Sequence, residues 1–149
     1  MILIAHNIRS LHNVGSLFRS ADAFGIEKIY LTGFTGQPPR KEIAKVALGS
    51  DQRMAWEWRE DVLELIDELK QNGFAILALD NIDRAVSIWD VQIHKPTALI
   101  LGNENEGIER DVLDKADHVL MIEMPGAKQS LNVSVAAGIA LFALQQKNR

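Results

Sequence analysis

Three hydrogen-bonding side chains open the most apolar segment of the chain. Ser130, Asn132 and Ser134 follow a Pro-Gly breaker, and nearly all the other residues up to Leu144 are apolar. One interpretation is helix capping, because Ser and Asn side chains accept hydrogen bonds from the unpaired N–H groups of a helix's first turn. The other is a ligand site, because those donors need a partner. Both interpretations stay open for Ser130 and Asn132 on these grounds.

A second polar pair near the N-terminus has the same double interpretation. Asn13 is expected to be the N-cap of a helix over residues 14–24 that stops at Gly25. Arg19 follows Asn13 by six residues and falls inside that helix. Taken singly, Asn13 is explained as a cap and Arg19 as an exposed basic side chain.

Acidic side chains gather in and after the segment GNENEG, residues 102–107. Glu104, Glu106, Glu109 and Asp111 form a group that could hold a hard cation. Acids before and within the first turn of a helix are more often solvated, and they stabilise that helix. The four histidines lack the spacing of a metal site, so no bound metal is expected; they are His6, His12, His94 and His118.

Several classes of function lose their signatures in this sequence. The chain has no cysteine, which excludes disulfides, iron–sulfur clusters and thiolate metal sites. It contains no G-x-G-x-x-G dinucleotide motif, no P-loop and no G-x-S-x-G nucleophile motif. The N-terminus lacks a secretory signal and no segment is long and apolar enough to span a bilayer, so a cytoplasmic protein is expected.

The charge is unevenly distributed along the chain. Residues 1–53 hold seven basic and four acidic side chains, a net charge of +3, whereas residues 54–149 hold nine basic and sixteen acidic ones, a net charge of −7. A polyanion such as RNA would therefore meet the first third of the chain. Chance clustering is the other explanation, because the numbers are small.

The elements that must position these residues alternate along the chain. Apolar segments typical of strands fall at residues 1–5, 27–33, 74–80, 97–101 and 118–124, and helical patterns at 14–24, 42–47, 60–73, 109–116 and 130–146. Such alternation predicts an α/β fold with a mostly parallel sheet and helices on both faces. Ligands of these sheets bind beyond the carboxyl ends of the strands, where residues 102–107 and 124–132 are expected.

The order of the polar segments resembles a known family. N-V-G-x-x-x-R-x-A-x-x-F-G (residues 13–25), I-L-G-N-E-N-E-G (100–107) and I-E-M-P-G-A-K-Q-S-L-N-V (122–133) are similar to the three motifs of the SpoU/TrmH branch of the SPOUT RNA methyltransferases. The resemblance covers nearly the whole chain. Asn105 stands where a second glycine is common, and Glu123 replaces a proline.

The resemblance implies a fold, an activity and a set of site residues. It implies a C-terminal deep trefoil knot, a homodimer, S-adenosyl-L-methionine as cofactor, and methylation of a ribose 2′-hydroxyl in tRNA or rRNA. The implied catalytic residues are Asn13, Arg19, Glu104, Ser130 and Asn132. The implied cofactor-binding residues are Leu79, Gly102, Ile122, Met124, Gly126 and Leu131.

Two alternatives from other classes stay open. A cofactor-free RNA-binding module would keep the fold but lose motif residues, and Arg19, Glu104, Ser130 and Asn132 are all present. A small-molecule α/β enzyme would need its own phosphate or nucleophile motif. One domain over residues 1–149 is expected, with no separate RNA-binding domain, so the methylated nucleotide is not predicted.

Overall fold

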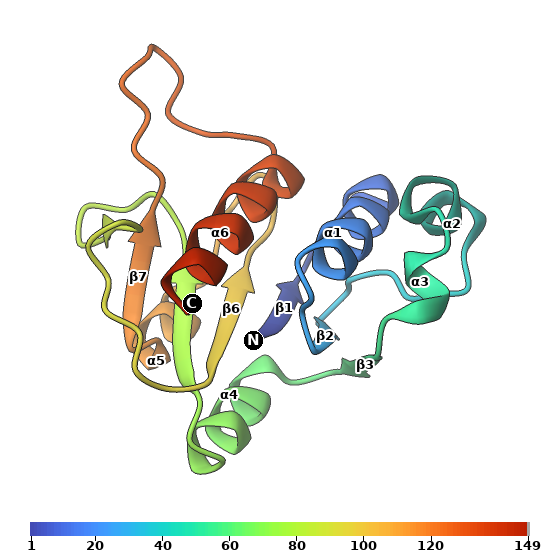
Figure 1. Ribbon diagram of the computed structural model, residues 1–149, viewed down its shortest axis with the longest axis horizontal. Coiled ribbons are helices and arrows are strands. Elements are labelled where there is room, and N and C mark those ends of the chain that lie inside the picture. The colour runs from blue at the N-terminus through green and yellow to red at the C-terminus, as the bar shows by residue number, and fades with distance from the viewer. Residues whose placement is uncertain (149) are drawn as a thin grey trace.

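The computed structural model describes residues 1–148, which form one parallel sheet with helices on both faces (Figure 1). The strands are β1 (Ile2–His6), β2 (Lys28–Thr32), β3 (Trp56–Arg59), β4 (Ala75–Leu79), β5 (Val86–Ser87), β6 (Thr97–Leu101) and β7 (His118–Met121). Their order is β3-β2-β1-β6-β4-β7-β5, and every pair is parallel. The predicted α/β class is confirmed.

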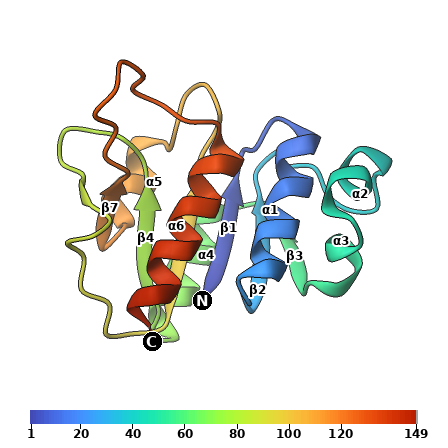
Figure 2. The same ribbon diagram turned by 45° about the horizontal axis from the view of Figure 1, so that its top comes forward.

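Six helices within residues 1–148 pack around the sheet, and one buried core lies between the sheet and the helices on each face. The helices are α1 (Leu11–Ala23), α2 (Lys41–Ala47), α3 (Ser50–Arg53), α4 (Val62–Gln71), α5 (Arg110–Lys115) and α6 (Val133–Lys147). Side chains of β1 alternate between the cores: Leu3 and Ala5 pack against α1, α2 and α6, and Ile2 and Ile4 pack against α4 and α5. Figure 2 shows α1 and α6 side by side on one face and α4 behind the sheet. Burial on both faces explains why these strands are apolar throughout.

Two short strands and one short helix were not predicted. β3 and β5 are the two edge strands, and β5 has only two residues. An edge strand pairs on one side only and buries less surface, so its sequence pattern is weak. α3 has four residues and lies in the region that sequence patterns left irregular.

The two helices that carry the polar motifs begin elsewhere than expected. α1 is capped by Ser10, whose side chain accepts from the Asn13 N–H, so the prediction that Asn13 is the N-cap is wrong. Asn13 lies in the first turn, where its side chain is free to bond other elements. α6 begins at Val133 with Asn132 as its N-cap, and Ser130 precedes the helix. Gly25, with φ of +67°, follows the end of α1 as predicted.

The last helix is not buried on every side. Ala137, Ala140 and Leu141 are buried against the sheet and α1, but Val135 and Ile139 are exposed. A helix that is apolar almost all round is typically covered on every side. One apolar face of α6 therefore stays uncovered in the single chain.

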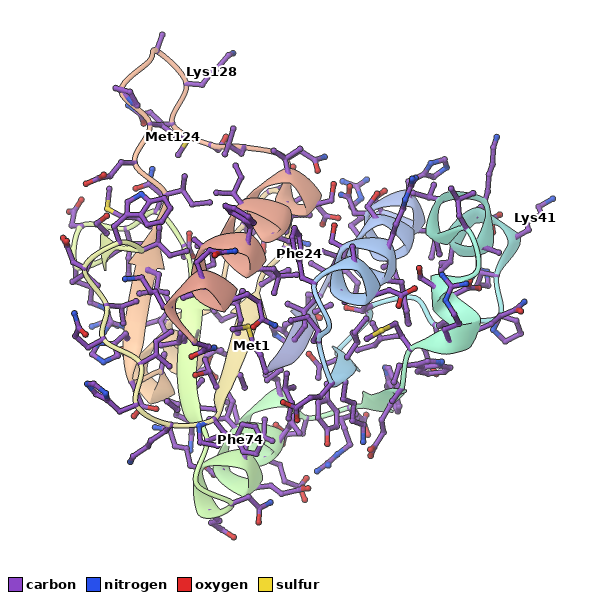
Figure 3. All side chains as sticks on the ribbon, viewed as in Figure 1. Met1, Phe24, Lys41, Phe74, Met124 and Lys128 are labelled. Atoms are coloured by element: carbon purple, nitrogen blue, oxygen red, sulfur yellow. The ribbon has the colours of Figure 1, made fainter. Side chains whose placement is uncertain are left out.

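The segment between β7 and α6 extends away from the body of the molecule. Figure 3 shows Lys128 in its outermost part and Met124 nearer the sheet. The deep trefoil knot implied for this C-terminal region stays a prediction. No helix within residues 1–148 has the length and apolar character needed to cross a membrane.

Candidate active site

A cavity of about 290 Å³ lies at the carboxyl edge of the sheet, where the α/β topology predicts a ligand site. It is bounded by residues that follow β4, β6 and β7, and by the segment that leads into α6. Its apolar wall includes Leu79, Leu101, Leu120, Ile122 and Leu131. Polar groups of residues 102–107 and Ser130 lie at the same cavity. An apolar cavity with a few polar groups is typical of small-molecule and cofactor sites.

Residues 102–107 form a tight turn on one side of the cavity. Asn103 and Gly107 exchange two backbone hydrogen bonds of 3.1 and 2.9 Å. The Asn103 side-chain oxygen accepts the N–H groups of Asn105 and Glu106, at 2.9 and 3.0 Å. A Cβ at Gly102 would lie 2.6 Å from the Gly107 carbonyl group. Glycine at 102 is thus required by the turn itself, a reason that the motif pattern does not reveal.

Glu104 joins this turn to the segment that precedes α1. Its carboxylate accepts the backbone N–H groups of Arg9 and Ser10 at 2.9 to 3.1 Å, and the side-chain amide of Asn13 at 3.0 Å. Burial raises the pKa of the Glu104 carboxyl, but these donors outweigh burial, so the pKa lies below its ordinary value. Glu104 is therefore a charged group that holds two motifs together.

Asn13 and Asn132 bring the third motif to the same place. The Asn132 side-chain amide lies 3.3 Å from the side-chain oxygen of Asn13, and the Asn132 oxygen accepts the N–H of Ser134 at 2.9 Å. Asn132 is thus both the N-cap of α6 and a contact to α1. Glu104, Asn13 and Asn132 form one chain of hydrogen bonds across three elements.

The remaining predicted catalytic residues lie apart from that chain. Ser130 lines the cavity, and the Asn81 side chain holds the neighbouring Gln129 carbonyl at 2.9 Å. Arg19 does not line the cavity. It is exposed on α1 and borders a shallow hollow with Asp22, Leu48 and Arg53.

Five of the six predicted cofactor-binding residues line the cavity. They are Leu79, Gly102, Ile122, Met124 and Leu131. Gly126 does not line it, and a Cβ added there would meet no atom within 4 Å. Leu79 and Ile122 come from the ends of β4 and β7, so the structure groups residues that lie far apart in the sequence.

A second polar cluster beside the cavity escaped the sequence analysis. The buried His6 ring contacts Thr32 Oγ1 at 2.8 Å and Glu109 Oε2 at 2.7 Å. The Asn7 side-chain amide donates to Glu109 Oε1 at 3.0 Å. His6 is a single polar residue at the end of the apolar strand β1, and one such residue forms no sequence pattern that would predict this cluster. Glu104 and Glu109 have separate partners, and no group of metal-binding side chains gathers within residues 1–148.

Fold and site together define an α/β protein with a ligand cavity bounded by the loops after β4, β6 and β7, two of which carry motifs. The chain belongs to the SpoU rRNA methylase family, whose profile matches residues 1–142. This is a family of RNA 2′-O-ribose methyltransferases. The predicted family is confirmed.

Relatives and solved structures agree with this assignment. A tRNA (guanosine(18)-2′-O)-methyltransferase of Aquifex aeolicus is 32% identical over 148 residues, which cover 99% of this chain and 69% of the relative. The crystal structure of the A. aeolicus TrmH/SpoU tRNA modifying enzyme matches with a TM-score of 0.89 at 33% identity, over 99% of this chain and 74% of that one. The crystal structure of an AdoMet-bound rRNA methyltransferase from Sinorhizobium meliloti matches with a TM-score of 0.91 at 26% identity. The match covers 97% of this chain and 55% of that one. The chain spans 58% to 69% of the length of the curated relatives that it matches.

Proposed function

We propose that this chain transfers a methyl group from S-adenosyl-L-methionine to a ribose 2′-hydroxyl of tRNA or rRNA. The observation that carries the proposal is that hydrogen bonds of Asn13 and Asn132 join the first and third motifs to Glu104, which lines the cavity. The A. aeolicus relative is named for tRNA and the S. meliloti structure for rRNA, so both substrates are retained. The proposed unit is one methyltransferase domain over residues 1–149, and an RNA substrate of this kind would place it in the cytoplasm.

The cavity suits the proposed cofactor. Its apolar wall of leucine and isoleucine side chains fits an adenine ring, and its volume is near the lower end of ligand pockets, about 300 Å³. Leu79, Gly102, Ile122, Met124 and Leu131 would hold the cofactor. The bound cofactor supplies a methyl group on a sulfonium centre, so transfer to a hydroxyl depends chiefly on positioning.

The residues around the cavity would position the ribose. Glu104 is a weak base because its pKa is lowered and its carboxylate already accepts three donors. Its role is to orient the segment that precedes α1 relative to the 102–107 turn. Ser130 lies at the cavity and supplies a hydroxyl toward the substrate. The proton of the 2′-hydroxyl would leave through a phosphate oxygen or water.

Arg19 would act on the RNA backbone. A guanidinium has five N–H donors and no acceptor, so Arg19 serves as a phosphate clamp and not as a base. It is exposed and outside the cavity of its own chain. The proposal therefore gives Arg19 a role in RNA binding and electrostatic stabilisation, separate from cofactor binding.

The chain is proposed to act as a homodimer through the uncovered face of α6. Val135, Ile139 and Phe142 are exposed at helical spacing on this face. Phe24, the C-cap residue of α1, packs beside Phe142 at 6.1 Å between ring centroids, so the apolar face continues to the end of α1. A two-fold partner would cover it, and two-fold dimers are the commonest oligomers.

The decisive experiment combines binding and transfer. Titration calorimetry should detect binding of S-adenosyl-L-methionine or of its demethylated product. Incubation with labelled cofactor and unmodified tRNA or rRNA transcripts should give a ribose-methylated nucleoside, identified by mass spectrometry after digestion. Cofactor binding without transfer to either RNA would contradict the proposed substrate. Absence of cofactor binding would favour the cofactor-free RNA-binding module.

A further inference from the structure

One exposed aromatic side chain belongs to a residue whose backbone is hydrogen-bonded to the polar cluster of His6, Asn7 and Glu109. Phe34, just after β2, is 63% exposed, the highest value among the large apolar side chains of residues 1–148. Its backbone N–H donates to the side-chain oxygen of Asn7 at 3.1 Å. Asn7 itself adopts φ of +53°, and its amide also donates to Glu109. The Asn7 side chain thus connects Phe34 to the polar cluster beside the cavity.

The residues on both sides of Phe34 are also fixed. Gly33 has φ of +62°, and a Cβ there would overlap the Asn7 side chain, so only glycine fits. The Gly33 carbonyl accepts the indole N–H of Trp58 at 3.0 Å. Thr35 is buried, and its hydroxyl accepts the Ile8 N–H and lies 2.9 Å from the Ala5 and Thr32 carbonyls. The Phe34 ring is exposed although its backbone is held in place on both sides, so core packing does not explain an aromatic residue at this position.

Arg9 lies between this support and the cavity. Its backbone N–H donates to Glu104, and it is only two residues beyond Asn7, at most about 7 Å along the chain. The Arg9 side chain is exposed and has no carboxylate partner within residues 1–148. The nearby carboxylates of Glu104 and Glu109 are already engaged by other donors. Arg9 is thus held by its backbone to Glu104, which lines the cavity. Phe34 is held by its backbone to Asn7, whose carbonyl accepts the side-chain amide of the cavity residue Asn103.

The surroundings of Phe34 fit RNA better than an apolar protein partner. Gln37 and Arg40, on the loop that follows, and Lys41, the first residue of α2, are exposed, and Figure 3 shows Lys41 projecting away from α2. Cores of protein interfaces are depleted of charged residues. Single-stranded RNA, by contrast, binds where aromatic rings stack on bases and cations contact phosphates. The positive first third of the chain matches such a polyanion.

We propose that Phe34 and Arg9 form a nucleotide platform beside the cavity. The Phe34 ring stacks on an unpaired base near the ribose that is methylated, and Arg9 contacts the adjoining phosphate. This inference rests on the proposed RNA methyltransferase function and names the surface that holds the substrate. Both residues recognise RNA and neither touches the cofactor, so their removal should leave cofactor affinity unchanged.

The test compares a base-bearing and a base-free probe. Affinity of the full chain is measured for a short single-stranded oligoribonucleotide and for an abasic strand of equal length and charge. Phe34→Ala should weaken binding of the first by about 5-fold to about 150-fold, the range expected for loss of one base stack, and leave the second unchanged. Phe34→Tyr should retain affinity and Phe34→Leu should not. Trp89→Ala is the control, because Trp89 is a 58% exposed aromatic residue beside β5, at the far edge of the sheet. This variant should bind both probes as wild type does.

Salt dependence tests the cation separately. Arg9→Ala should reduce the slope of log affinity against log salt by about 0.7, because one phosphate contact on a single strand is lost. Lys95→Ala, an exposed cation before β6, is the matched control and should leave the slope unchanged.

The outcomes separate this inference from the function on which it rests. If the wild-type chain methylates RNA but Phe34→Ala matches Trp89→Ala in affinity and rate, the platform is wrong and the function stands. If Phe34→Leu retains full affinity, an aromatic ring is not needed and the platform is wrong. If Phe34→Ala changes only the oligomeric state, the ring contacts protein and the platform is again wrong. If the wild-type chain binds no RNA, both are overturned.

Discussion

The side chains of Asn13 and Asn132 meet at 3.3 Å although 119 residues separate them in the chain. The contact joins the first turn of α1 to the N-cap of α6, and Glu104 holds the other end of Asn13. Motif residues that look independent in the sequence are therefore one hydrogen-bonded unit. Substitutions within this unit should separate its structural role from its role in methyl transfer.

Asn132 allows that separation directly. Asn132→Ala removes the N-cap of α6 and should lower the free energy of unfolding by about 0.5 to 2 kcal/mol. Asn132→Ser keeps an oxygen for the cap but lacks the amide that reaches Asn13, so it should be nearly as stable as wild type and as poor in methyl transfer as Asn132→Ala. Denaturant unfolding and single-turnover transfer measure the two effects. Wild-type transfer by Asn132→Ser would show that the contact to Asn13 is dispensable.

Glu104 should make stability depend on acid pH. Because its pKa is lowered in the folded chain, its stabilising contribution is complete above the ordinary value of 4.5 and is lost as pH falls through the lowered pKa. Glu104→Gln removes this contribution. The difference in unfolding free energy between wild type and Glu104→Gln should be largest near neutral pH and shrink on acidification below that value. A difference that stays constant in urea unfolding across this range would contradict the assigned hydrogen-bond effect.

Gly102 and Gly126 form a matched pair of substitutions. Gly102→Ala forces a Cβ against the Gly107 backbone and should lower the unfolding free energy by about 1 to 3 kcal/mol, with weaker cofactor binding. Gly126→Ala has open space and should change stability by less than about 0.5 kcal/mol and leave cofactor affinity unchanged. Thermal unfolding and titration calorimetry on both variants test this. Equal effects would mean that the 102–107 turn adapts freely.

Arg19 should matter for transfer and not for folding. Arg19→Ala should change the free energy of unfolding by less than about 0.5 kcal/mol and leave cofactor affinity unchanged. The same variant should lose most of its methyl transfer activity. Arg19→Lys should rescue poorly, because an ammonium cannot form a bidentate pair with phosphate. Arg110→Ala, on the exposed side of α5, is the control for loss of a surface arginine, since the Arg110 side chain is 94% exposed. Near-wild-type transfer by Arg19→Ala would remove Arg19 from the proposed mechanism.

The exposed face of α6 should carry the proposed dimer. Val135→Glu places a charge on this face and should shift light scattering toward a monomer, because burying an unpaired carboxylate is unfavourable. Val86→Glu is the matched control, since Val86 on edge strand β5 is 43% exposed and Val135 is 51% exposed. The dimer is refuted if light scattering finds the wild-type chain monomeric at micromolar concentration. It is also refuted if Val135→Glu and Val86→Glu have the same molar mass in solution.

The sequence alone determined the fold class and most of the wall of the cavity. Apolar strands alternating with helices require a sheet buried on both faces, and the ligand edge follows from parallel strand direction. The resemblance to the family, and not the strand pattern, named Leu79, Gly102, Ile122, Met124 and Leu131, which line the cavity. Edge strands β3 and β5 were missed because short, one-sided pairing leaves little pattern.

Only the tertiary structure decided which polar groups meet. Asn13 looked like a helix cap, yet Ser10 takes that position. The Asn13 side chain instead donates its amide to Glu104 and accepts the Asn132 amide at its oxygen. Gly102 was implied only as a cofactor-binding residue, yet the Gly107 backbone occupies the space that a Cβ at position 102 would need. Hydrogen bonds between loops depend on where parallel strands end side by side, and residues far apart in the chain carry no local signal of that meeting. The sequence names candidate side chains, and packing of the sheet and of α6 against α1 selects their partners.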